Sequence, residues 1–230
     1  MKTLGLIGGT GWVSSIDYYR LINLEINKRL GGLQAAKLIL YSINYGEIDA
    51  FNQKDDLESV YGLIKNAAVK LKSSGAGGLV LCANTTHMFA ERLQQEIKLP
   101  LIHIGEATAR AINDRGFQKV ALLGTKFTME MDFYKAKLNK YGIEMMVPAK
   151  DDRVFIHRAI MDELLKNDFR PKTKAKFLDI ISNLIDDGAQ GIVLGCTEIP
   201  LLVKPEDIDV PLFNTTEIHA LAAVEFALGA

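Results

Sequence analysis

An internal repeat constrains the fold of this 230-residue chain more than any other feature. Three pairs of segments match in the same order at nearly the same offset, 111 to 115 residues: Gly5–Thr10 with Val120–Thr125, Gly75–Leu81 with Gly188–Leu194, and Pro100–Ile102 with Pro211–Phe213. Repeated segments in a fixed order predict repeated structural units. We therefore expect two similar lobes related by a pseudo-two-fold axis, residues 1–100 with 211–230 and residues 101–210, with a cleft between them.

Short apolar runs alternate with longer stretches of helical period along both lobes. The expected strands are Leu4–Ile7, Lys37–Ile43, Gly78–Leu81, Leu101–His103, Val120–Leu123, Glu144–Val147, Gly191–Leu194 and Leu212–Phe213. The expected helices are Ser14–Leu30, Leu57–Ser73, Thr86–Glu96, Gly105–Asn113, Thr128–Lys140, Arg153–Lys166, Thr173–Asp187 and Thr216–Leu228. This alternation predicts an α/β fold with a parallel four-stranded sheet in each lobe, flanked by helices. Ligands bind such sheets at the carboxyl ends of the strands, so we expect the active site in the cleft.

Composition narrows the class of protein. Apolar residues make up 48% of the chain and charged residues 24%, which is typical of a globular protein. The net charge of −1 argues against nucleic acid or an anionic membrane as the main partner. The first apolar run ends at Gly8 and Gly9, so it is expected to be a strand rather than a signal peptide or membrane span. The expected compartment is the cytoplasm, where thiols stay reduced.

Two equivalent strand ends carry the residues with chemical potential. The segment Cys82–His87 follows one expected strand, and Gly195–Glu198 follows its counterpart in the other lobe. Each segment precedes a helix, and helix N-termini bind carboxylates and lower the pKa of nearby thiols. The two cysteines of the chain, Cys82 and Cys196, are therefore candidates for acid/base chemistry.

These residues resemble those of the cofactor-independent aspartate/glutamate racemases, and the resemblance covers nearly the whole chain. The segments that carry it are Ile7–Thr10 with Tyr18 and Tyr19, Leu81–His87, Leu123–Thr125, Gly195–Ile199 and Asn214–Ala220. The resemblance implies a racemase that acts on aspartate or glutamate without pyridoxal phosphate or metal. It also implies a homodimer.

Racemisation removes the α-proton from one face of the substrate and returns a proton to the other. Without a cofactor this needs two acid/base groups on opposite sides of Cα, and thiols suit the task because their pKa can be tuned. The resemblance places Cys196 on one side. Hydroxyls and backbone amides would hold the substrate carboxylates and stabilise the developing charge, at Thr10, Asn84, Thr85, Thr86, Thr125 and Thr197.

The opposite acid/base position departs from the family pattern. In the family this residue usually stands directly before the Asn, as Cys-Asn-Thr, or as the Thr of Cys-Thr-Asn-Thr. That position is Ala83 here, and the repeat independently pairs Ala83 with Cys196. An alanine methyl cannot transfer a proton. Cys82 stands one residue earlier, where a strand-end side chain points to the other face unless a local bulge redirects it.

Each of the other candidate residues could have a structural role instead of a functional one. His87 would relay a proton or bond nearby backbone, and Glu198 would partner the thiol or cap a helix. The resemblance places a basic residue for the side-chain carboxylate near Gln53 and Lys54, and a Lys for the distal carboxylate near Lys166. Exposed lysines are more often simply solvated.

The sequence argues against two other kinds of site. A dinucleotide site would need Gly-x-Gly-x-x-Gly, but the run from Gly9 reaches Ser14 where the third glycine is required. Zinc-ligand spacings of cysteine and histidine are absent from the sequence. Two alternatives stay open: a one-cysteine decarboxylase similar to the arylmalonate decarboxylases, since a carbanion needs only one proton donor, and a non-catalytic binder of amino acids or dicarboxylates.

Overall fold

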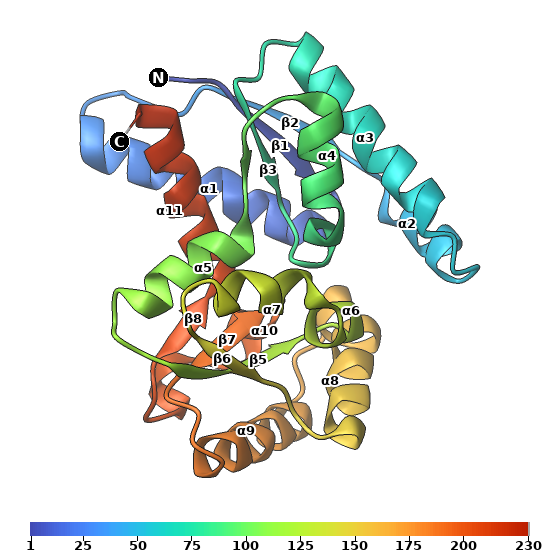
Figure 1. The fold of residues 1–230 in the computed structure, drawn as a ribbon, viewed down its shortest axis with the longest axis vertical. Coiled ribbons are helices and arrows are strands. Elements are labelled where there is room, and N and C mark those ends of the chain that lie inside the picture. The colour runs from blue at the N-terminus through green and yellow to red at the C-terminus, as the bar shows by residue number, and fades with distance from the viewer. Residues whose placement is uncertain (230) are drawn as a thin grey trace. The chain divides into compact units, whose positions relative to one another are not determined.

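The computed structural model describes residues 1–229, which divide into two compact units. Unit 1 comprises Met1–Ile104 and the chain from His219 onward, and unit 2 comprises Gly105–Ile218 (Figure 1). The chain therefore passes between units after Ile104 and again before His219. These boundaries differ from the expected ones at 100/101 and 210/211 because the strand after residue 100 pairs within unit 1, and the strand after residue 211 pairs within unit 2.

Unit 1 contains one parallel sheet in the order β2-β1-β3-β4. Its strands are β1 (Leu4–Gly8), β2 (Leu38–Ser42), β3 (Gly78–Leu81) and β4 (Leu101–Ile102). β1 lies between β2 and β3, and Ile7 pairs with Leu81 near the carboxyl ends of the two strands. The residues that follow β1 and β3 therefore leave the sheet at the same edge.

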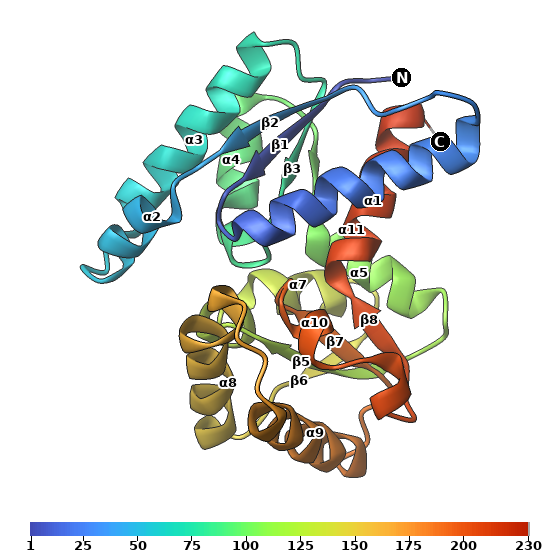
Figure 2. The ribbon, with the colours of Figure 1, turned by 180° about the vertical axis from the view of Figure 1, so that it is seen from behind.

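Helices cover both faces of this sheet. One face packs on α2 (Tyr45–Asn52), α3 (Leu57–Ser73) and α4 (Ala90–Ile97), which follows the short 3₁₀ helix η1 (Thr85–Phe89). The other packs on α1 (Trp12–Leu30) and α11 (Thr215–Leu228), and both views show these helices on the side away from α3 (Figures 1 and 2). Alternate residues of β1 supply the two clusters: Leu4 and Leu6 face α1 and α11, whereas Ile7 faces α3.

Unit 2 repeats this topology, with a parallel sheet in the order β6-β5-β7-β8. Its strands are β5 (Lys119–Gly124), β6 (Glu144–Met146), β7 (Ile192–Gly195) and β8 (Leu212–Asn214). The repeat predicted from the sequence therefore corresponds to equivalent strands, β1 with β5, β3 with β7 and β4 with β8. The predicted α/β fold with two four-stranded parallel sheets flanked by helices is confirmed.

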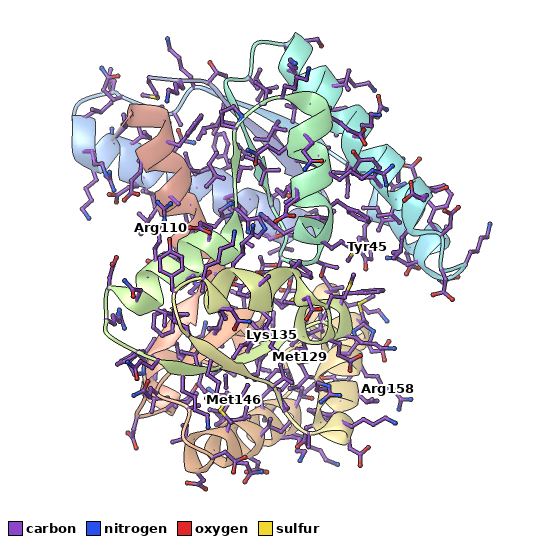
Figure 3. The ribbon with its side chains drawn as sticks, in the orientation of Figure 1. Tyr45, Arg110, Met129, Lys135, Met146 and Arg158 are labelled. Carbon is purple, nitrogen blue, oxygen red and sulfur yellow. The ribbon has the colours of Figure 1, made fainter. Side chains whose placement is uncertain are left out.

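The helices and short turns of unit 2 are α5 (Ile104–Asn113), α6 (Lys126–Glu130), α7 (Asp132–Asn139), α8 (Lys150–Asp162), η2 (Leu164–Lys166), α9 (Pro171–Asp186), α10 (Ile199–Leu202) and η3 (Pro205–Asp207). Residues of α8 and α9 form one apolar cluster with alternate residues of β5 and β7, and Cys196 belongs to it. Met129 of α6 is part of the same cluster and Met146 of β6 packs against it; both are labelled in Figure 3.

Several helical expectations needed correction. The helix expected over Arg153–Lys166 begins at Lys150 and ends at Asp162, before η2, and the one expected over Thr86–Glu96 is η1 followed by α4. Helix α2 was not predicted: Asn44 caps it by accepting a hydrogen bond from the Gly46 N–H at 3.1 Å, in a segment expected to be a loop. The single helix expected over Thr128–Lys140 is two helices, because the backbone at Met131 is extended. Among the described residues, no helix combines the length and apolar character needed to cross a membrane.

Candidate functional site

The first group of candidate residues lies at the carboxyl edge of the unit 1 sheet. Gly9 ends β1 with a positive φ of 84°, and a Cβ there would collide with the Ile43 main chain. This turn brings Thr10 to the start of α1. The Thr10 hydroxyl is buried and has no hydrogen-bond partner among residues 1–229. An unpaired buried hydroxyl is costly unless a ligand or water satisfies it, and the role of Thr10 as a substrate contact stays a prediction.

Cys82 lies on the wrong side of the same strand end. Its amide still donates to the Ile7 carbonyl at 2.9 Å, as in the sheet. Its side chain has no exposed surface and packs in the cluster with Tyr18 and Val80, beneath α1 and α11. Burial raises the pKa of the Cys82 thiol far above its ordinary value. The bulge that would have turned Cys82 toward a substrate is not formed, and Cys82 is a core residue.

Ala83 begins the turn that follows β3 and is half-buried, unlike Cys82. Its carbonyl accepts two hydrogen bonds, from the Thr86 hydroxyl at 3.0 Å and from His87 Nδ1 at 2.8 Å. The Thr86 hydroxyl therefore donates its hydrogen bond to the backbone and cannot donate it to a substrate carboxylate. The relay role considered for His87 is also wrong, because both of its ring nitrogens bond to backbone groups.

The second group of candidate residues follows β7 in unit 2. The thiol of Cys196 donates to Glu198 Oε2 at 3.0 Å, and the Thr197 hydroxyl donates to the same oxygen at 2.7 Å. Only 7% of Cys196 and 4% of Glu198 are exposed. A carboxylate that accepts from a thiol is a local acceptor for the thiol proton, so this pair has the composition of an acid/base couple.

The pKa of the Cys196 thiol differs from the sequence expectation. Burial raises it well above the ordinary value, and the negative charge of Glu198 raises it further. The backbone N–H groups of Thr197 and Glu198 do lower the pKa of this thiol, as expected, but burial and Glu198 outweigh them. Cys196 is therefore a protonated thiol in the ligand-free protein.

Thr125 lies beside this pair along the sheet edge. Gly124 pairs with Gly195, so the residues that follow these two glycines leave adjacent strands together. The Thr125 hydroxyl caps α6 by accepting from the Thr128 N–H at 3.4 Å and also bonds the Thr128 hydroxyl at 3.1 Å. Its hydroxyl therefore has a structural role, and a substrate contact at Thr125 stays a prediction.

Thr216 is a candidate that the sequence reasoning missed. β8 pairs with β7 so that Asn214 lies opposite Leu194, and the Thr215 hydroxyl donates to the Leu194 carbonyl at 2.8 Å. Thr216 comes next, is 4% exposed, and its hydroxyl has no hydrogen-bond partner within the described chain. The signal was available in the sequence, since Thr216 directly follows a strand beside the one that leads to Cys196.

The remaining predicted contacts lie away from the strand ends. Gln53 is exposed at the end of α2, where its amide donates to Asp49 Oδ2 at 2.8 Å, and Lys54 is exposed beside it. Lys166 is exposed at the end of η2. Over residues 1–229, no group of three or more His, Cys, Asp or Glu side chains is arranged to hold a metal ion.

Known proteins share this sequence and fold. The family model described as Asp/Glu/hydantoin racemase matches residues 7–223. The crystal structure of a Yersinia pestis protein assigned as an Asp/Glu racemase is 45% identical, with a TM-score of 0.92 over 99% of this chain and 100% of that one. The crystal structure of an aspartate racemase homologue from Pyrococcus horikoshii OT3 is 36% identical, with a TM-score of 0.83 over the same shares.

A curated relative gives the same result. The broad specificity amino-acid racemase RacX of Bacillus subtilis (strain 168) is 24% identical over 169 residues, which span 74% of this chain and 73% of that protein. The region matched by the family model includes the strand ends of both units that carry the candidate residues. The chain belongs to the Asp/Glu/hydantoin racemase family, and its homologues support an isomerase activity of the racemase type.

Proposed function

We propose that this protein is a cofactor-independent amino-acid racemase whose substrate is aspartate or glutamate, with Cys196 as the acid/base group at Cα. The observation that carries the proposal is the hydrogen bond from the Cys196 thiol to Glu198 at the carboxyl end of β7. A buried thiol with a carboxylate acceptor can exist in both the proton-donating and proton-accepting states that exchange at Cα requires.

The proton moves in two steps, first within the Cys196–Glu198 pair and then from the substrate to Cys196. Glu198 takes the thiol proton, which leaves a thiolate on Cys196. The thiolate then takes the α-proton of the substrate, and the electron pair of the broken C–H bond passes into the carboxylate as an enolate-like anion. Reversal of these steps returns a proton from Cys196 to Cα. We propose Thr10, Asn84 and Thr85 as contacts for the substrate carboxylates, which would stabilise that anion.

Ala83 sets the efficiency of this reaction. A second acid/base group is needed on the other face of Cα for inversion, and the equivalent position carries only a methyl group. We therefore propose that Cys196 exchanges the α-proton on one face and that inversion is slow. Substrate binding does not depend on the missing group and persists.

The test is an assay for substrate and stereochemistry together. The protein is incubated separately with L- and D-aspartate and with L- and D-glutamate, and the products are separated on a chiral column. Slow inversion of one of these amino acids, lost in Cys196→Ala, supports the proposal. Inversion of none of them, with no calorimetric binding of any, would contradict it.

Ala83 also favours one alternative, a decarboxylase with a single proton donor. Such an enzyme would release CO₂ from a malonate-type substrate and use Cys196 only to protonate the resulting carbanion. The same preparations are therefore assayed for CO₂ release from a substituted malonate. Release that depends on Cys196, without amino-acid exchange, would assign the protein to this alternative.

We further propose that the protein is a cytoplasmic homodimer. Both cysteines are free thiols, the state that a reducing compartment maintains. Helix α1 exposes Trp12, Ile16 and Tyr19 at spacings that place them on one helical face. An exposed apolar stripe of this kind is typical of a surface that contacts another protein, and a second copy is the proposed partner.

A further inference from the structure

Three histidines, His87, His103 and His219, form a cluster beside the turn that begins at Ala83. The ring of His87 is 4.9 Å from that of His103 and 5.2 Å from that of His219, between ring centroids. His87 and His219 are almost completely buried. All three belong to unit 1, and His219 is the first residue of its second segment. Buried histidines need defined partners, so their hydrogen bonds determine what they can do.

The partners of His87 fix its tautomer. Nδ1 lies 2.8 Å from the Ala83 carbonyl, which can only accept, so Nδ1 carries the proton. Nε2 accepts from the Ile104 N–H at 3.2 Å, so Nε2 carries none. The ring is therefore neutral. Protonation at Nε2 would break the bond to Ile104.

These two bonds connect the turn to the point where the chain leaves unit 1. The His87 N–H also donates to the Asn84 carbonyl at 3.0 Å, so main chain and ring of His87 together bracket residues 83 to 86. On its other side the ring is bonded to Ile104, the last residue of the first segment of unit 1. A turn held at both ends has little freedom to rotate, which fixes the amides of Asn84 and Thr85.

His219 is bonded to the chain next to the residues that hold His87. His219 Nε2 donates to the Ile102 carbonyl at 2.7 Å, and the Tyr18 hydroxyl donates to His219 Nδ1 at 2.7 Å. These bonds hold the end of β4, two residues before Ile104, but do not touch the Ala83 turn. Tyr18 therefore offers a control that perturbs the same cluster without removing the bond between His87 and Ala83.

We propose that His87 is a positioning residue, whose neutral Nδ1–H tautomer clamps the residue 83 carbonyl and holds the Asn84–Thr85 amides in place for a substrate carboxylate. The inference rests on the proposed function, since it needs a carboxylate ligand at this turn. Under this proposal residue 83 contributes through its main-chain carbonyl, which anchors the turn, and not through its methyl side chain.

Two substitutions separate the two bonds of the ring. In His87→Asn the amide nitrogen occupies about the place of Nδ1 and keeps a donor for the Ala83 carbonyl. In His87→Gln the longer amide reaches the place of Nε2 and keeps a partner for Ile104, but loses the clamp. Tyr18→Phe is the matched control. Each variant is titrated with L-aspartate and with succinate, an unreactive dicarboxylate, by calorimetry, and melting temperatures are recorded without ligand.

We expect His87→Gln to bind both ligands about tenfold more weakly than the wild type, as loss of one well-placed hydrogen bond implies. His87→Asn is expected to stay within about threefold of the wild type, and Tyr18→Phe to melt earlier while binding normally. In the wild type, two-dimensional ¹⁵N–¹H spectra of labelled histidine should show His87 as the Nδ1–H tautomer from pH 6 to 8.

Three results would overturn the inference. One is an Nε2–H tautomer at His87. Another is binding by His87→Gln equal to that of the wild type. The third is an equal loss of binding in His87→Asn and His87→Gln that follows an equal fall in melting temperature, which would show a purely structural role. Failure of the wild type to bind either ligand would overturn the proposed function and this inference with it, and so differs from the three results above.

Discussion

The Cys196 thiol donates a hydrogen bond to Glu198 Oε2 over 3.0 Å, and both side chains are buried. Burial and the Glu198 charge raise the pKa of Cys196, so the couple rests with the proton on sulfur. Such a thiol reacts only when its proton moves to an acceptor at the moment of reaction. Under the proposed mechanism Glu198 is that acceptor, and the pair, rather than Cys196 alone, is the functional unit.

Replacing Glu198 by glutamine should lower the pKa of Cys196, because it removes the charge that opposes the thiolate, although burial keeps the pKa above its ordinary value. Alkylation of Cys196 by iodoacetamide should therefore begin at lower pH in Glu198→Gln than in the wild type. Exchange of the α-proton should nevertheless slow by about 10²-fold, because the local acceptor is gone. Cys82→Ala in both proteins restricts the alkylation signal to Cys196. Alkylation shifted to higher pH would contradict the coupling.

Ala83 can be tested by restoring an acid/base group. Ala83→Thr and Ala83→Cys should raise the rate of inversion by about 10² to 10⁴-fold, the usual contribution of one general acid or base. Ala83→Val is the matched control for threonine, since it has nearly the same shape without the hydroxyl. A chiral assay measures all variants. Equal rates for Ala83→Val and Ala83→Thr would mean that the hydroxyl has no part in the gain.

Cys82 should matter for stability and not for the reaction. Its side chain is fully buried among apolar residues of unit 1. Cys82→Ala should cost about 1 to 2 kcal/mol of the free energy of unfolding, as a small core deletion does, and leave proton exchange unchanged. Urea unfolding and the exchange assay measure the two effects. Cys82→Val, which fills the space, is the control; loss of exchange in a stably folded Cys82→Val would return Cys82 to the reaction.

The buried histidine His219 predicts acid sensitivity. Its pKa is lowered from 6.5 to about 3, first because burial disfavours the imidazolium and then because His87 is close. The unfolded chain takes up this proton below pH 6.5 and the folded chain does not. This contribution to stability is therefore fully present above pH 6.5 and is lost as the pH falls toward 3. The loss is about 1.4 kcal/mol per pH unit within that window.

Urea titrations at pH 7.5, 6 and 4.5 test this prediction. His219→Leu removes the titrating group and also the bonds to Ile102 and Tyr18. It should therefore be less stable at neutral pH but should lose less stability on acidification. Parallel pH dependences in the wild type and His219→Leu would show that other groups govern the acid sensitivity.

The exposed stripe on α1 predicts the assembly state. Light scattering behind size exclusion should give a dimer mass for the wild type. Trp12→Glu should shift the equilibrium toward the monomer, because it places a charge in an apolar contact, whereas Lys98→Glu, at the end of α4, should not. A wild-type monomer at micromolar concentration would reject the dimer.

Much of the fold and part of the site followed from the sequence. The repeat made Ala83 the equivalent of Cys196 after matching strands, and period-2 geometry correctly placed the Cys82 side chain on the other face of the strand end. Helix α2 was missed because its start depends on a local cap at Asn44 rather than on apolar periodicity. That error also misplaced Gln53, which ends the helix instead of lying in a loop.

Other features of the site depend on three-dimensional contacts that no linear pattern reports. The raised pKa of Cys196 follows from how deeply the β7 end is buried and from the orientation of Glu198. The structural use of the Thr86 hydroxyl follows from the tight turn at Ala83. The position of Thr216 after a strand is visible in the sequence, but the burial of its unpartnered hydroxyl is seen only in the structure.

The most direct test of the central claim is proton NMR of aspartate and glutamate, each enantiomer separately, in D₂O with the wild-type protein and with Cys196→Ala. Loss of the α-proton signal from one enantiomer, faster than the opposite enantiomer appears and absent in Cys196→Ala, is the predicted result. Exchange that persists in Cys196→Ala, or no exchange of any of the four amino acids by the wild type, would contradict the assignment of Cys196 as the acid/base group.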